Sequence, residues 1–222
     1  MHKSIVFFAV LGSVMLAACG SKNDANEKNF SAAINQYFEA KDNTPIGGLC
    51  LNIMDWPVDV VPGRREWNEK TGRAKQMTTL EAVGLVKGEE VEADDGKKTK
   101  IKRYTLTEAA KPFIREKDVN QIGFSESKTV KKPDICWGKR VVDKVVKWEG
   151  PMKLGDYQEA KVTYTYKVIN LVEWAKKPEV QETFPVIKHI LDGAGTEEDR
   201  HSVHLTSQGW EAAGLNSLKH RF

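Results

Sequence analysis

The sequence predicts an α+β fold in which small antiparallel sheets pack against helices. Three patterns carry this prediction. The stretch RYTLTEAAKPFI, residues 103–114, runs from an alternating strand through a Thr into a helical segment. Two longer alternating segments, RVVDKVVKWEG and EAKVTYTYKVINL, are typical of a hairpin closed across GPMKLGDYQ. The segment EKNFSAAINQYFEAKD carries apolar residues at helical spacing, which predicts a helix with one packed face.

The remaining elements follow from turn and breaker residues. GLCLNIMDWPVDVV reads as a strand that Pro57 interrupts. QMTTLEAVGLV predicts a helix ending at Gly84, a residue type suited to the left-handed backbone that follows many helices. After the strand KIKRYTL, Thr107 is expected to cap the next helix by accepting a backbone N–H. Further along, Pro178 suits a first helical turn, and Pro185 should break the helix.

The order of helix, turn, hairpin and helix resembles the recognition helix and wing of the winged-helix superfamily. The resemblance rests on five residues: Leu80, Gly84, Leu85, Leu106 and Thr107. Ala110 stands where that family usually has Gly. The alternative is a β-hairpin leading into a capped helix, without such a relationship.

A second stretch, SVHLTSQGWEAAGL, repeats the pattern of an alternating strand, Leu-Thr and an expected helix, with Gly209 at the place that Ala110 occupied. One interpretation is a degenerate duplication, with an N-terminal α+β lobe at 27–130 and a C-terminal α+β lobe at 131–222. The other is chance recurrence of a common local motif, with both ranges in one domain.

The N-terminus has the layout of an export signal. In MHKSIVFFAVLGSVMLAACGSK, Lys3 precedes an apolar stretch that is too short for a permanent anchor. The sequence Leu16-Ala17-Ala18-Cys19 resembles a bacterial lipobox. That resemblance implies a signal peptide at 1–18, a lipid on Cys19 and a polar tether at 19–26, and therefore attachment to a membrane. The alternative is an ordinary secretory signal with an incidental cysteine.

Export has consequences for location and partners. Gly20 after the cysteine resembles the sorting pattern of lipoproteins sent to the outer membrane, which implies a lipid-anchored protein facing the periplasm. Such a chain has no access to the chromosome. The 34 lysines and arginines nearly balance the 31 acidic residues, so no cationic excess marks a nucleic-acid surface. We therefore predict no nucleic-acid partner.

Motifs for catalysis and metal binding are weak. Ser125-Glu126-Ser127-Lys128 matches S-x-x-K and Lys70-Thr71-Gly72 matches K-T-G, but their order is the reverse of that in penicillin-binding proteins. Asp55 and Asp59 flank Trp56-Pro57, a carboxylate pair that either serves sugar chemistry or belongs to a turn. His201 and His204 are expected on a strand, where their spacing sends them to opposite faces.

We accordingly predict no catalytic residue, no metal site and no cofactor. The favoured function is a non-catalytic binding or structural module for an envelope protein, peptidoglycan or a glycolipid, through a groove lined by Trp and Tyr. The alternative is a small envelope hydrolase whose site is assembled only in the fold.

The other two cysteines are expected to form a disulfide. With Cys19 used by the lipid, Cys50 and Cys136 remain, each at the start of an expected β segment and in an oxidising compartment. A bridge would close a loop of about 85 residues and stabilise the fold by roughly 4 kcal/mol. The alternative is a pair of buried, unpaired cysteines.

Overall fold

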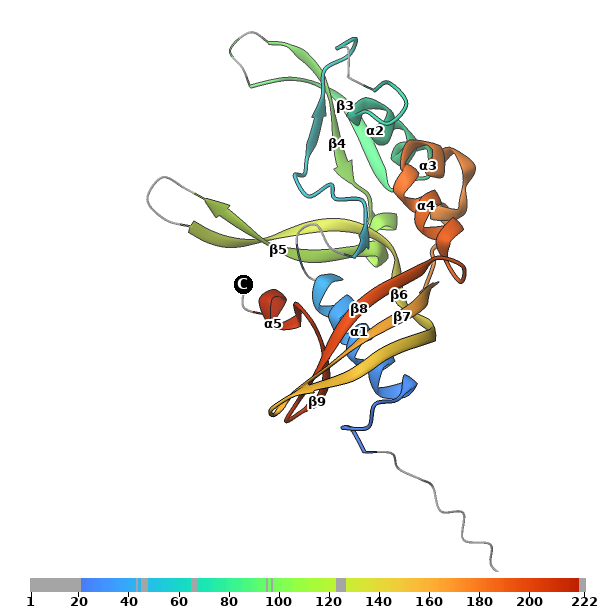
Figure 1. Cartoon of the computed structure of the whole chain (residues 1–222). Helices are drawn as coiled ribbons and strands as arrows, with labels where there is room; N and C mark the ends of the chain where they lie inside the picture. Colours follow the sequence, from blue (N-terminus) through green and yellow to red (C-terminus); the bar gives the residue numbers. More distant parts are fainter. Residues whose placement is uncertain are drawn as a thin grey trace, which may run out of the picture.

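The computed structural model describes residues 21–42, 44, 48–64, 68–94, 96, 98–122 and 127–219. Figure 1 shows helices packed on antiparallel strands, which confirms the α+β class. The elements are, in order, α1 (Glu27–Asp42), β1 (Leu49–Cys50), β2 (Val58–Val60), α2 (Arg73–Ala82), β3 (Val86–Glu92), β4 (Lys100–Leu106), the 3-10 helix η1 (Glu108–Phe113), β5 (Ile114–Ile122), β6 (Ser127–Leu154), β7 (Tyr157–Ile169), the 3-10 helix η2 (Glu173–Lys176), α3 (Pro178–Thr183), α4 (Pro185–Gly193), β8 (Glu198–Thr206), β9 (Gly209–Ala212) and α5 (Leu215–Lys219).

The strands form two antiparallel sheets. The larger has the order β1-β6-β7-β8-β9, with β5 also paired to β6, and the smaller has the order β2-β4-β3. Strand β6 is 28 residues long and pairs in turn with β5, β1 and β7. In Figure 1 the small sheet and helices α2 to α4 lie at the upper end of the molecule, and α1 with β6 to β9 lies at the lower end.

The lower core forms where α1 packs on one face of β6 to β9. The ring of Phe30 lies edge-on to Trp148 and Trp210, with centroids 5.4 and 5.0 Å apart. Asn35 on the same helix accepts a hydrogen bond of 2.8 Å from the backbone N–H of Val142. That N–H lies beside a β-bulge, where the ladder is irregular, so the helix supplies the acceptor there.

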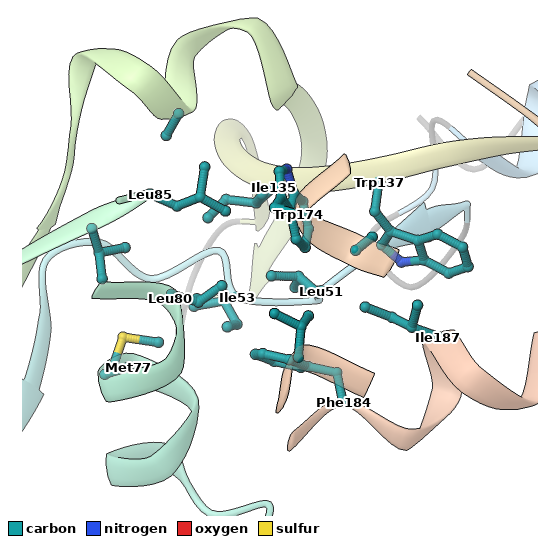
Figure 2. Close-up of a cluster of buried hydrophobic side chains, with 14 of the residues drawn as sticks. Leu51, Ile53, Met77, Leu80, Leu85, Ile135, Trp137, Trp174, Phe184 and Ile187 are labelled. Carbon is teal, nitrogen blue, oxygen red and sulfur yellow. The ribbon is translucent and has the colours of Figure 1, made fainter. Parts of the chain in front are cut away.

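The upper core joins α2, α3 and α4 to the chain around β1 and β6. Figure 2 shows Leu80 of α2, Ile135 of β6 and Phe184 beside α4 in one cluster with the other labelled side chains. A hydrogen bond of 2.9 Å between the hydroxyls of Thr79 and Thr183 also links α2 to α3 inside this core. Helices α2 and α3 are thus held together by burial and by a buried polar contact.

Both cores combine distant parts of the sequence. The boundary that the sequence suggested between residues 130 and 131 lies inside β6. The lower core packs α1 against strands that follow residue 139, and the upper core packs α2 against α3. Each core therefore contains residues from both 27–130 and 131–222.

Most local predictions are confirmed. Helix α2 is followed by Gly84 at φ +79°, and the N–H of Leu85 donates to the carbonyl of Leu80 at 2.9 Å, as expected for a glycine-terminated helix. Pro178 and Pro185 each stand at the first turn of a helix, so the second ends α3 and begins α4. The predicted hairpin is β6–β7, with a turn at Gly155.

Two local predictions are wrong. Thr107 does precede a helix, but its hydroxyl makes no capping bond and instead donates to the carbonyl of Gly84 at 2.7 Å. The stretch after Thr206 is not a helix, because Gly209–Ala212 forms strand β9 on β8. A tight turn at 207–208 lets this segment complete the sheet, where Trp210 and Ala212 enter the lower core.

Candidate functional site

Cys50 and Cys136 form a disulfide that connects the edge strand β1 to β6. The two residues are direct partners in the antiparallel register, with Cα atoms 3.8 Å apart, closer than the roughly 4.4 Å that usually marks the lower limit. The bridge spans a sequence separation of 86 residues. Without it, the two-residue strand β1 would be held by few ladder hydrogen bonds.

A buried charged cluster lies beside the disulfide. Asp134 stands two residues before Cys136, so both side chains point to the same face of β6. Both Asp134 and Lys117 of β5 are fully buried. The carboxylate of Asp134 accepts the backbone N–H groups of Asn52 and Ile53, each at 3.2 Å, and the ammonium of Lys117 donates to the backbone carbonyl of Asp42. The cluster therefore ties β5, β6, the chain after β1 and the end of α1 together.

Burial disturbs the protonation of this cluster. Removal from water raises the pKa of Asp134, against the opposing effect of the Ile53 N–H and of nearby Lys117. The same removal lowers the pKa of Lys117, although Asp134 and Asp42 attract its charge. Since both side chains are enclosed, we assign them a structural role rather than a catalytic one.

Asp42 is the carboxyl best placed for chemistry. Burial raises its pKa, and the charge of Arg115 opposes that rise most strongly. It also lines a cavity of about 130 Å³ together with Phe38 and Arg140. A raised pKa in a cavity is typical of a general acid. No Ser, Thr, Cys or His is among the described residues that line this cavity, so no hydroxyl, thiol or imidazole lies beside Asp42 there.

The carboxylate pair Asp55 and Asp59 lies in the chain around Pro57. Both line a cavity of about 280 Å³, with Arg73 at the start of α2. Each already has a cationic partner: Lys132 of β6 for Asp55, and Arg103 of β4, which makes two hydrogen bonds of 2.7 Å, for Asp59. Although both carboxylates border this cavity, their ion pairs connect the chain around Pro57 to β6 and β4.

The protonation state of Asp59 does not suit the general acid of a glycosidase. The hydrogen bond from Arg103 holds the pKa of Asp59 below its usual value. A glycosidase needs one carboxyl that is protonated near neutral pH. Asp59 stays ionised instead, so it does not supply this acid, and its ion pair with Arg103 agrees with a structural role in the turn.

Several of the aromatic side chains are buried inside the protein. Trp137, Trp174 and Trp210 are buried in the two cores. Tyr104 and Tyr164 are buried as well, and the burial of Tyr164 raises its pKa. These five side chains fill the interior of the described part of the chain, whereas Trp148 and Tyr157 are exposed.

The two histidines of β8 face opposite ways. The ring of His201 lies against Tyr37 of α1, with centroids 4.4 Å apart, whereas His204 stacks on Tyr157 of β7. They cannot share an ion in this arrangement. Across the described residues, no group of three or more His, Cys, Asp or Glu side chains is placed to hold a metal.

The other motifs add little. Lys70 and Thr71 form a turn in which the side chain of Asn68 accepts both of their backbone N–H groups, just before α2. Ser125 of the S-x-x-K match lies outside the described residues, as do Cys19 and the whole of 1–18.

We expect the Ser125→Ala variant to behave as wild type, because the S-x-x-K match lacks the order and the partners of the penicillin-binding family. A fluorescent β-lactam should leave the wild-type protein unlabelled on a denaturing gel, and its intact mass should stay unchanged. A covalent adduct on Ser125 would contradict this prediction.

Comparison of the chain with known protein families, with curated proteins and with solved structures gives no match. A search of the described residues for a helix long and apolar enough to cross a membrane finds none.

Proposed function

We propose that the chain is a lipid-anchored protein of the bacterial cell envelope, held at the membrane by Cys19 and facing the periplasm from the outer membrane. The observation that carries this proposal is the disulfide between Cys50 and Cys136, because such bonds persist chiefly in oxidising compartments. The lipobox Leu16-Ala17-Ala18-Cys19 after an export segment supports the same location. Only Cys19 then remains for modification, since the other two cysteines are paired.

The same proposal assigns a binding or structural role toward an envelope protein, peptidoglycan or a glycolipid. The contacts of the charged side chains support a role without catalysis. Asp55 and Asp59 are engaged in ion pairs, and Lys117 and Asp134 are buried. In-cell crosslinking of the full chain, followed by mass spectrometry of the captured material, tests this role. Recovery of one specific envelope component supports it.

The alternative, a small envelope hydrolase, rests on Asp42 in its cavity. Ester, amide and glycoside reporters would separate the two, with Asp42→Asn as the matched variant. Turnover by the wild-type protein that Asp42→Asn abolishes, while the thermal midpoint is retained, would favour the hydrolase.

The Cys19→Ala variant should lose metabolic labelling by a radioactive or clickable fatty acid and should remain as an unprocessed or soluble chain. The reason is that diacylation needs the cysteine thiol, which alanine lacks. Cys50→Ser with Cys136→Ser is the control, because it removes two cysteines without touching the lipobox and should still be labelled. Continued labelling of Cys19→Ala would disprove the anchor.

A further inference from the structure

The tip of the β6–β7 hairpin exposes an apolar patch. Met152 and Leu154 on one strand and Tyr157 on the other have exposed fractions of 72, 82 and 50 %. Leu154 and Tyr157 are register partners across the turn, and Met152 lies two residues before Leu154, so the three side chains share one face of the hairpin. Exposed apolar patches of this kind mark surfaces that meet a protein or a membrane.

Exposed basic side chains lie behind the tip on the same face. Lys161 follows Tyr157 by four residues on β7 and points to the same face. Thr163, the next residue on that face, pairs with Lys147 of β6 and with Arg200 of β8. Lysine stems can lie along an apolar surface while the ammonium reaches a headgroup. Glu149, the partner of Lys161, faces the same way, so the apolar residues rather than net charge would dominate the contact.

The start of the described chain is held next to this tip. Lys22 donates through its ammonium to the carbonyl of Ser207 at 2.8 Å, and the indole of Trp210 donates to the carbonyl of Asn23 at 3.1 Å. Gly209 allows this approach, because a Cβ there would lie 3.1 Å from the carbonyl oxygen of Lys22. Residues 21–23 are therefore fixed on the β8–β9 turn and are not a free tether.

The β8–β9 turn and the hairpin tip belong to the same end of the molecule. Glu159 of β7 is the register partner of His204 of β8, and Tyr157 stacks on that histidine. Figure 1 shows the tip, the β8–β9 turn and the first described residues together at the lower end. Cys19 stands two residues before Ser21, a distance that extended chain covers in about 7 Å.

We propose that the β6–β7 tip enters the interface of the bilayer beside the lipid on Cys19, with Met152, Leu154 and Tyr157 among the headgroups. This inference rests on the proposed lipid anchor. The short distance from Cys19 to the docked residues brings the membrane surface to the tip. Two contacts, the acyl chains and the hairpin, then fix the orientation of the domain and hold the small sheet β2-β4-β3 away from the membrane.

The test places a probe at the tip of the full, lipidated protein. The Leu154→Cys variant is purified from the envelope, labelled with the environment-sensitive dye NBD, and reconstituted in vesicles of phosphatidylethanolamine and phosphatidylglycerol with or without doxyl lipids. Val61→Cys, after β2 at the other end of the molecule, is the matched control because Val61 is also exposed. Unchanged thermal midpoints show that both variants are folded, and fatty-acid labelling of Cys19 is measured on the same samples.

We expect the probe at position 154 to emit at shorter wavelength in vesicles and to be quenched severalfold more by doxyl lipids than the probe at position 61. Equal quenching at both positions in a lipidated protein would overturn the tip contact and leave the anchor intact. Capture of a protein or a second copy by a photo-crosslinker at position 154, without quenching, would also overturn it. Absence of fatty acid from Cys19 would refute the proposed anchor and, with it, this inference.

Discussion

Replacement of both Cys50 and Cys136 by serine is expected to lower the free energy of unfolding by about 4 kcal/mol, because the bridge closes a long loop and restricts the unfolded chain. For a protein of this size, such a loss corresponds to a fall of roughly 8 to 16 °C in the thermal midpoint. Loss of the bridge should also weaken the folded state, since the bridge holds the two-residue strand β1 on β6.

Chemical denaturation of the wild type and of the double variant measures this loss. The control is the wild-type protein unfolded in the presence of a reductant, which should match the double variant, and the reductant should leave the double variant unchanged. Equal midpoints for the wild type with and without reductant would show that the bridge contributes no stability. Two alkylatable thiols in the unreduced, unfolded protein would show that it is absent.

Asp134→Ala is expected to cost about 3 to 5 kcal/mol, the usual loss when one member of a buried charged group is removed. The substitution leaves the N–H groups of Asn52 and Ile53 without their acceptor. It also removes a negative charge that helps to keep Lys117 protonated inside the protein. The contacts that would be lost join β6 to the chain after β1, next to the disulfide.

Two further variants test whether the loss of stability comes from the buried cluster or from the removal of any charge. Glu116→Ala on β5 breaks an exposed contact with Lys131 and should change the stability by less than about 1 kcal/mol. Asp134→Asn combined with Lys117→Met removes both buried charges and keeps one acceptor for the backbone, so it should lose less than Asp134→Ala alone. If Asp134→Ala proved as mild as Glu116→Ala, the cluster would not hold these strands.

Local patterns determined most of the elements. The apolar spacing of α1, the glycine after α2, the alternation of β6 and β7 and the prolines that begin α3 and α4 each act within a few residues, so the sequence alone predicts them. The bridge between Cys50 and Cys136 was also predictable, because the lipid that the lipobox implies on Cys19 leaves this one pair of cysteines.

Contacts between distant residues decided the rest. The segment Gly209–Ala212 carries a cap and helix signal, yet it is a strand because β8 offers an edge and the lower core takes Trp210. Lys117 and Asp134 belong to no motif in the sequence, and only the packing of β5, β6 and α1 buries them. The sequence predicts a hairpin turn at Met152 and Leu154, but only the contacts of residues 21–23 with the β8–β9 turn show which segment of the chain lies beside this tip. Periodicity specifies which face of an element is apolar, but strand register and packing decide which faces meet.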